Sequence, residues 1–246
     1  MPQGLSRTPR FHVHGTLAAG AELTLPPDAG HHASRVLRMR EGDPACLFNG
    51  EGGEHTGRIV RISRESVTIE IGEFSPVERE SPLRVTLVQA ISAGDRMDLT
   101  IQKAVELGVA AIQPILAERS VVRLKGDRSD TRRAHWQRIA AAACEQCGRN
   151  RVPLVAAALV PADYRAPEGS IKLLLSPTGT TSLRAVAPGD KSIAIAVGPE
   201  AGFSPREEAT LVAAGFAPIR LGPRVLRTET AGPAALAALN VLHGDG

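Results

Sequence analysis

Hydrophobic and polar residues alternate in three stretches of the first third of the chain. These are residues 11–14, 58–62 and 66–71, and the alternation predicts half-buried β-strands because successive side chains of a strand point to opposite faces. A glycine-rich stretch, residues 50–53, is typical of a hairpin turn. Residues 1–74 are therefore predicted to form a small β-barrel domain.

A short helix is predicted within this domain at residues 31–40, HHASRVLRMR, with Val36 and Leu37 facing inward. It carries three arginines, Arg35, Arg38 and Arg40. Such a cluster can neutralise phosphates of a nucleic acid, although a solvated helix face explains it equally simply.

The pattern changes after a polar segment bounded by two prolines. We interpret residues 75–83 as a linker, and from residue 84 predicted strands alternate with predicted helices. The strands are residues 85–91, 111–116, 171–175, 192–197 and 218–221, and the two helices before the last strands are residues 95–107 and 131–147. Strands that alternate with helices indicate a parallel sheet covered on both faces, so residues 84–246 are predicted to form an α/β domain.

Two glycine-bearing turns follow the last two predicted strands, at residues 198–202 and 221–224. Both lie at carboxyl ends of strands, where an open α/β sheet binds small ligands. Neither turn matches a known nucleotide fingerprint: a P-loop needs Gly-Lys-Ser/Thr, and a dinucleotide-binding site needs Gly-x-Gly-x-x-Gly. Nucleoside triphosphates and NAD are therefore disfavoured as ligands.

Helix signals flank the second turn. Ser204 and Glu207 form a Ser-x-x-Glu capping box around Pro205, and Gly215 ends that helix. A last helix is predicted with Thr228 or Thr230 as its N-cap and residues 234–242 as its body.

Composition is typical of a soluble globular protein of one or two domains. Of 246 residues, 43% are hydrophobic but only 3% aromatic, and the formal net charge is +3. Arginine makes up 25 of the 29 basic residues, which suits phosphate recognition but also follows from genome composition. Residues 119–151 carry nine basic and three acidic side chains, so an electrostatic attraction toward nucleic acid is plausible.

Cysteines and histidines do not indicate a metal site. Cys46, Cys144 and Cys147 are too few for a disulfide framework, and Cys144 and Cys147 lack a second ligand pair. We therefore expect reduced, structural cysteines and no metal. The N-terminus lacks the apolar core of a signal peptide, and no apolar run reaches the roughly 18 residues of a membrane span. We expect a cytoplasmic protein without membrane contact.

Several motifs carry a family resemblance. GPEAGFS from Gly198 and LGPRVLRTETA from Leu221 resemble the bacterial small-subunit rRNA uridine N3-methyltransferases of the RsmE type, within the SPOUT superfamily. QKAVELG, ERS and EQCGR follow the same family order, and the segment from Arg10 through HHASRVLRMREGD resembles the family's PUA-like barrel. The chain departs from the family pattern at Ala201, usually glycine, and at Ala93, commonly lysine or arginine.

This resemblance implies a C-terminal SPOUT domain with a trefoil knot, a homodimer with active sites at the subunit interface, and S-adenosylmethionine as cofactor. Backbone groups of three loops would read the adenine edge, while Leu175, Val225 and Leu226 would sandwich its ring. The cofactor residues implied are Leu174, Leu175, Ser176, Pro177, Val197, Gly198, Pro199, Glu200, Gly202, Leu221, Gly222, Val225 and Leu226.

The implied reaction places demands on nearby side chains. N3 of uridine carries a proton, so the enzyme must remove it or stabilise the uridinate that forms. Arg227 is the predicted charge stabiliser, reaching a uracil carbonyl or holding a phosphate. Glu229 or Glu200 would act as base or orient the nucleotide, although Glu229 also suits a helix start without any catalytic role.

The implied substrate is a decoding-region uridine of 16S rRNA within the assembled 30S subunit. Residues expected to contact RNA are Arg10, Arg35, Arg38, Arg40, Arg119 and Arg149. Two alternatives stay open: a related methyltransferase acting on tRNA or a ribose 2′-hydroxyl, and a non-catalytic RNA-binding assembly factor.

Overall fold

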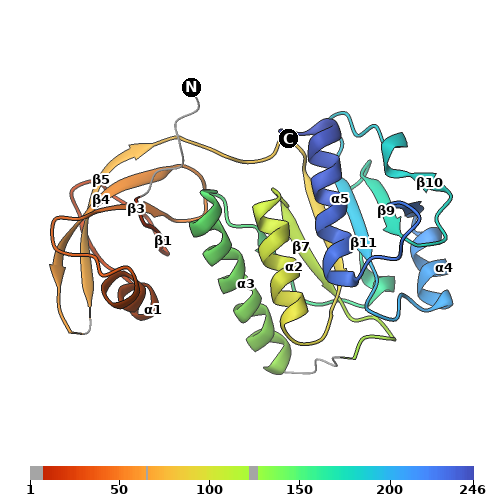
Figure 1. The fold of residues 1–246 in the computed structure, drawn as a ribbon, viewed down its shortest axis with the longest axis horizontal. Coiled ribbons are helices and arrows are strands. Elements are labelled where there is room, and N and C mark those ends of the chain that lie inside the picture. Colours follow the sequence, from red (N-terminus) through yellow and green to blue (C-terminus); the bar gives the residue numbers. More distant parts are fainter. Residues whose placement is uncertain (1–7, 65, 122–126) are drawn as a thin grey trace. The chain divides into compact units, whose positions relative to one another are not determined.

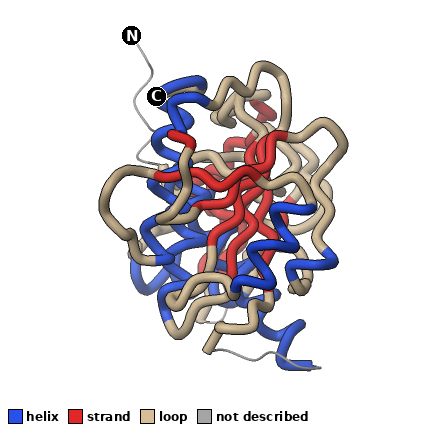
Figure 2. Tube along the Cα trace, turned by 90° about the vertical axis from the view of Figure 1, so that its right-hand side faces the viewer, coloured by secondary structure: helices blue, strands red, loops and turns tan. Residues whose placement is uncertain are grey.

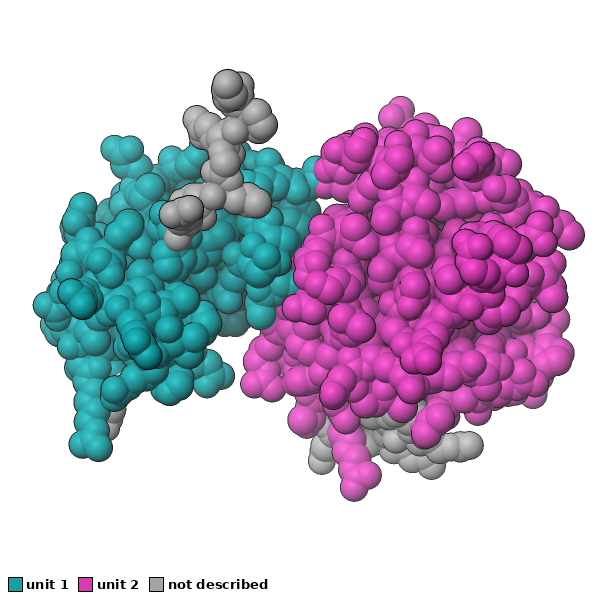
Figure 3. Space-filling view, in the orientation of Figure 1, with its two compact units in different colours: residues 1–80, 141–152 teal, residues 81–140, 153–246 magenta. Residues whose placement is uncertain are grey.

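The computed structural model describes residues 8–64, 66–121 and 127–246. It divides into two compact units (Figures 1 and 3), the first formed by Met1–Glu80 with Ala141–Val152 and the second by Ser81–Ala140 with Pro153–Gly246. The sequence suggested a continuous division around a linker at residues 75–83, whereas here the segment Ala141–Val152 packs with the first unit. Arg123 and Lys125, which belong to the basic region of the sequence, lie outside the described residues.

The first unit is a five-stranded sheet with a helical segment. The strands have the order β1-β3-β4-β5-β2; β1 pairs with β3 in parallel, and the other neighbours are antiparallel. The elements are β1 (Arg10–His12), β2 (Glu22–Thr24), α1 (Pro27–His31), the π-helical turn η1 (His32–Val36), β3 (Pro44–Phe48), β4 (Glu54–Ile62) and β5 (Val67–Ser75). Phe11, Leu47, Ile59 and Ile69 contribute to one core, around which the sheet curls.

The helical segment differs from its prediction in both position and phase. It begins at Pro27 rather than at His31, and Val36 and Leu37, predicted to face inward, are 60% and 42% exposed. Ala33 and Met39 occupy the core instead. The reason is the π turn, in which the Leu37 N–H donates to the His32 carbonyl at 2.9 Å. This hydrogen bond reaches back five residues rather than the four of an α-helix, so the side chains that follow are rotated away from their α-helical positions.

The second unit is an all-parallel α/β sheet, as predicted. Its seven strands have the order β10-β12-β9-β11-β6-β7-β8. The elements are β6 (Val85–Ala90), α2 (Asp95–Glu106), β7 (Ala111–Ile115), α3 (Asp127–Cys147, which ends in the first unit), β8 (Leu154–Val155), η2 (Pro161–Asp163), β9 (Ile171–Leu175), β10 (Thr181–Ser182), η3 (Leu183–Ala185), β11 (Ile193–Val197), α4 (Pro205–Ala213), β12 (Ala217–Arg220) and α5 (Thr228–His243). The five predicted strands agree with these bounds to within one residue, while β8 and β10 were not predicted.

Helices cover both faces of this sheet (Figure 2). On one face Val88 and Ala90 of β6 share a core with Leu211 of α4. On the opposite face Leu87 approaches Gly232 of α5, where an added Cβ would lie 3.1 Å from the leucine side chain. Alternate residues of β6 thus point to α4 and to α5, which is the period-two arrangement of a strand buried on both sides. Among the described helices, none is long and apolar enough to cross a membrane.

The predicted N-cap of α4 is confirmed, whereas the predicted N-cap of α5 is wrong. Ser204 caps α4 in a complete capping box: its hydroxyl accepts from the Glu207 N–H at 3.2 Å, and the Glu207 carboxylate accepts from the Ser204 N–H at 2.9 Å. The N-cap of α5, however, is Arg227, with no side-chain cap. Thr228 is already helical, and its hydroxyl is engaged in a tertiary hydrogen bond instead.

Candidate functional site

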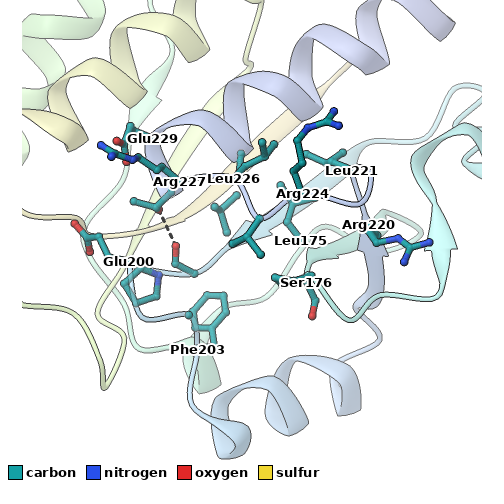
Figure 4. Close-up of a pocket in the computed structure, with 18 of the residues that line it drawn as sticks. Leu175, Ser176, Glu200, Phe203, Arg220, Leu221, Arg224, Leu226, Arg227 and Glu229 are labelled. Atoms are coloured by element: carbon teal, nitrogen blue, oxygen red, sulfur yellow. Dashed lines mark hydrogen bonds between the residues drawn. The ribbon is translucent and has the colours of Figure 1, made fainter.

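A pocket of about 430 Å³ lies at the carboxyl ends of β9, β11 and β12 (Figure 4). The loops after these strands and the first turn of α5 form its walls, so residues distant in sequence line one cavity. Its size falls within the range of roughly 300–1,000 Å³ that small-molecule sites occupy.

Most residues predicted to hold the cofactor line this pocket. The exceptions are Leu174, which is 1% exposed in the core beside α4, and Gly222, which turns the chain at φ +126°. Ala201, one of the departures from the family pattern, is exposed and does not line the pocket. Eight further lining residues were not among those named in advance as cofactor-binding or catalytic: Arg96, Phe203, Glu208, Ile219, Arg220, Arg224, Thr228 and Ala231.

The pocket has an apolar middle and charged ends. In Figure 4, Leu175 and Leu226 lie between a group formed by Arg227, Glu229 and Glu200 on one side and Arg220 on the other. Val225 also lines the cavity and is 77% exposed, an unusual position for an isolated aliphatic side chain. A ligand with an apolar, planar part and polar ends would bury this surface.

Gly198 begins the loop after β11 and has no room for a side chain. A Cβ at this position would lie 2.9 Å from the backbone nitrogen of Phe203, closer than such atoms approach. The Gly198 carbonyl accepts a hydrogen bond from the Thr228 hydroxyl at 2.7 Å. The loop is therefore tightly folded on itself and is tied to the first turn of α5.

Glu200, one of the three predicted catalytic residues, is held by neighbours. Its Oε1 accepts from Arg96 Nη1 at 2.8 Å and from the Ala93 N–H at 3.2 Å. Burial acts to raise the pKa of Glu200, but its own backbone N–H, Arg96 and the Ala93 N–H together lower that pKa below its ordinary value. A carboxylate with a lowered pKa is a weaker proton acceptor, so this arrangement favours anchoring over general-base catalysis.

Glu229 and Arg227 are less constrained. The Oε2 atom of Glu229 is buried and has no hydrogen-bond partner among the described residues. A buried carboxylate oxygen without a partner is unfavourable for stability, and native proteins retain such atoms for a reason such as a catalytic role or an ordered water. Arg227 lines the same end of the pocket and is exposed. The two side chains thus offer a proton acceptor and a cation at one place.

The loop around residues 201–203 is fixed from outside the pocket. Arg119, predicted to contact RNA, donates to the carbonyls of Ala201 and Phe203 at 3.2 and 3.4 Å. Glu207, in addition to its capping role, accepts from the Glu118 N–H at 2.8 Å. Arg119 thus joins the loop after β7 to the loop after β11, and Glu118 joins it to the first turn of α4, so Arg119 is placed to support the pocket wall.

Two other arginines predicted to bind RNA are enclosed in the first unit. Arg10 is 10% exposed and pairs with Glu54 at 2.5 Å, while also donating to Asn150 Oδ1 at 2.5 Å. Arg149, with 5% of its side chain exposed, pairs with Glu80. These contacts favour a structural role for both residues, because their guanidinium groups bind protein acceptors.

Arg35, Arg38 and Arg40 are exposed on the segment that contains the π turn. Arg38 adopts φ +55°, the one positive φ of a non-glycine residue in the described chain. Their side chains are accessible to a phosphate backbone, and their role in RNA binding stays a prediction. Cys46, Cys144 and Cys147 form no disulfide, and burial raises the pKa of Cys144 to about 12. The described residues contain no cluster of metal-ligating side chains.

Comparisons with known proteins agree with this geometry. Residues 79–240 match the family model of an RNA methyltransferase domain, and residues 25–72 match that of an RNA methyltransferase PUA domain. A ribosomal RNA small subunit methyltransferase E from Buchnera aphidicola is 34% identical over 241 residues, covering 97% of this chain and 98% of the relative.

Two solved structures are similar over nearly the whole chain. Ribosomal RNA small subunit methyltransferase E from Neisseria gonorrhoeae, bound to S-adenosylmethionine, shares 41% identity at a TM-score of 0.90, covering 97% of this chain and 99% of its own. A putative methyltransferase from Legionella pneumophila, in complex with the same cofactor, shares 40% identity at a TM-score of 0.94, covering 98% and 100%. These similarities confirm the predicted fold class, a PUA-like domain followed by a SPOUT methyltransferase domain. The chain belongs to the ribosomal RNA small subunit methyltransferase E family.

Proposed function

We propose that this protein transfers the methyl group of S-adenosylmethionine to N3 of a decoding-region uridine in 16S rRNA, on the assembled 30S subunit. Family membership supports the coarser statement, cofactor-dependent methylation of small-subunit rRNA. The observation that carries the finer proposal is the pocket end where Arg227 lies beside Glu229, whose buried Oε2 lacks a partner among the described residues.

The pocket residues fit the cofactor. Leu175, Val225 and Leu226 offer apolar surface for an adenine ring, and the tight fold of the loop at Gly198 fixes the backbone of that pocket wall. Arginine and glutamate side chains at the ends of the pocket suit a ligand with both charges. When bound, S-adenosylmethionine supplies a methyl group activated by its sulfonium, so no metal is needed.

The nucleotide poses the harder problem, because neutral N3 of uridine is a poor nucleophile. Loss of the N3 proton would leave a uridinate whose negative charge is shared with the uracil oxygens, and transfer of the methyl group to N3 would remove that charge. Glu229 is the acceptor we propose for that proton. Arg227, close by, would stabilise the charge on a uracil oxygen.

Partner and compartment follow the family expectation. We propose that two copies form the active enzyme, with each site at the subunit interface, and that the enzyme acts in the cytoplasm. The exposed Arg35, Arg38 and Arg40 would bind rRNA phosphates from the first unit.

The test is methyl transfer from labelled cofactor to three substrates offered separately: undermethylated small subunits, free 16S rRNA and tRNA. Incorporation into small subunits well above the other two supports the proposal. Preferential labelling of tRNA would contradict the proposal and indicate a related methyltransferase that acts on tRNA. RNA binding without any incorporation would instead indicate a non-catalytic assembly factor.

A further inference from the structure

Gln89 is a polar residue at the centre of the second unit. It lies near the end of β6, in register with Val197, the last residue of β11, and it is 0% exposed. An uncharged amide in such a position lowers stability unless it is hydrogen-bonded. A buried glutamine directly beneath the pocket loop therefore needs a reason.

The hydrogen bonds of Gln89 fix which way its amide points. Its Nε2 donates to the Ala90 carbonyl at 3.0 Å and to the Thr228 hydroxyl at 2.9 Å. Because a carbonyl only accepts, the nitrogen and not the oxygen must face Ala90. Its Oε1 has no partner among the described residues, so the amide is held by its donor side alone.

This orientation determines the direction of the next hydrogen bond. The Thr228 oxygen accepts from Gln89, so its single proton is free to point elsewhere, and it points to the Gly198 carbonyl at 2.7 Å. The result is a directed chain of hydrogen bonds from Gln89 through Thr228 to Gly198. Removal of the first donor would leave the hydroxyl free to rotate away from Gly198.

The geometry points to Gln89 as a positioning residue for the reaction, acting through Thr228. Thr228 lies between Arg227 and Glu229, and Gly198 starts the loop after β11, which also lines the pocket. The hydrogen-bond chain therefore sets the distance between the residues that we propose act on the nucleotide and the loop that we propose holds the cofactor. This inference rests on the proposed function.

The neighbouring strand provides a matched control. Gln113 of β7 is also buried, and its Nε2 likewise donates to the carbonyl of the following residue, Pro114, at 3.0 Å. Its second hydrogen bond goes to the Ala157 carbonyl at 2.7 Å rather than to the pocket. Gln113→Leu thus removes the same kind of buried amide without touching the chain from Gln89 to Gly198.

The experiment compares Gln89→Leu, Thr228→Val, the double variant, Thr228→Ser and Gln113→Leu. Thermal unfolding, cofactor affinity by calorimetry without RNA, and turnover on small subunits at saturating cofactor are measured for each. We expect turnover about ten-fold lower or more in Gln89→Leu and in Thr228→Val, because misplacement of reacting groups reduces rate steeply. Since both changes break one chain, the double variant should be no worse than the poorer single variant.

Two comparisons separate positioning from general stability. Thr228→Ser, which keeps the hydroxyl, should stay within about three-fold of wild type, and Gln113→Leu should lose stability but keep turnover. Cofactor affinity should weaken several-fold in Gln89→Leu and Thr228→Val and not in Gln113→Leu. Equal loss in Gln113→Leu, or multiplicative losses in the double variant, would overturn the inference.

A failure of the proposed function has a different outcome. In that case the wild-type protein itself would be inactive on small subunits. The calorimetric comparison would still decide the role of Gln89: equal cofactor affinity in wild type, Gln89→Leu and Thr228→Val would refute it without any reference to turnover.

Discussion

The carboxylate of Glu200 is bound by the guanidinium of Arg96 at 2.8 Å, across 104 residues of sequence. Because the Ala93 N–H donates to the same oxygen, Glu200 joins the start of α2 to the pocket loop after β11. Ala93, the second departure from the family pattern, thus contributes through its backbone N–H, which every residue except proline also has.

Glu200→Gln and Arg96→Ala should weaken cofactor binding and leave turnover at saturating cofactor nearly unchanged. The pair is partly exposed, with 47% of the arginine and 28% of the glutamate side chain accessible. Such pairs stabilise by at most about 1 kcal/mol, so the dissociation constant should rise by no more than about five-fold. Turnover a hundred-fold lower at unchanged affinity would identify Glu200 as a proton acceptor instead.

Arg227→Ala should lower turnover by about 10²–10³-fold, the usual effect of removing one group that stabilises developing charge. Cofactor affinity should change little, because the proposed partner of Arg227 is the nucleotide. Arg206→Ala is the control, since Arg206 is an exposed arginine of α4 that does not line the pocket. Equal turnover in the two variants would remove Arg227 from the mechanism.

Glu229→Gln should reduce turnover by about 10²–10⁴-fold, the range for a lost general base. The amide preserves the shape and cannot accept the N3 proton. Because uridine loses that proton spontaneously at alkaline pH, the variant should recover activity as pH rises, whereas wild type should be less dependent on pH in this range. A variant with wild-type turnover and an unchanged pH profile would leave Glu229 as a helix-start carboxylate only.

The predicted RNA-binding arginines should separate into two groups. Arg10→Ala breaks a buried ion pair with Glu54 and should destabilise the protein by about 3–5 kcal/mol. Arg35→Ala and Arg38→Ala should leave the unfolding midpoint unchanged, while the removal of one phosphate-binding side chain should reduce the slope of RNA affinity against salt concentration by about 0.7–0.9. Denaturation measures the effect on stability, and RNA binding at several salt concentrations measures the effect on phosphate contacts. An Arg10→Ala protein with wild-type stability and weakened RNA binding would contradict the assignment of Arg10 to the structural group.

Stability of the first unit should depend on the protonation of Glu145. Burial raises the pKa of Glu145, and the hydrogen bond from the His12 N–H at 2.7 Å and the charge of Arg10 offset this only in part. A raised pKa means that the contribution of Glu145 to stability is present below its unfolded pKa of about 4.3 and is lost as pH rises through the folded value.

Glu145→Gln keeps the acceptor for His12 without the charge. It should therefore be more stable than wild type at pH 7, with the difference shrinking toward pH 4. Urea denaturation at the two pH values measures this, and a Glu145→Gln protein that is less stable than wild type at pH 7 would show that the carboxylate stabilises the fold.

Local signals predicted the α/β domain and the pocket loops well. The capping box at Ser204 and the apolar runs of the strands involve residues close together in the chain. The start of α4 and the positions of the strands could therefore be predicted from the sequence. Both glycine turns follow strands of a parallel sheet, and the topology alone brings such turns to one edge.

What the sequence did not predict depends on long-range contacts. The sequence shows that Arg10 is charged but not which groups it binds. Its partners Glu54 and Asn150 are distant in the chain, and Asn150 belongs to the segment 141–152 that joins the first unit. The π turn at His32–Val36 contains one residue more per hydrogen-bonded turn than an α-helix, and no local pattern of the sequence indicates this insertion. Gln89 lies within a mostly apolar strand, and only the structure places it against Thr228.

The most direct test of the proposed chemistry is mass spectrometry of nucleosides from small subunits methylated by the purified protein. The account predicts a single new product, 3-methyluridine, that forms at least about a hundred-fold more slowly in Arg227→Ala and Glu229→Gln. A methyl group on a ribose oxygen, or on another base, would contradict the proposed attack by N3, although the fold and the pocket would stand.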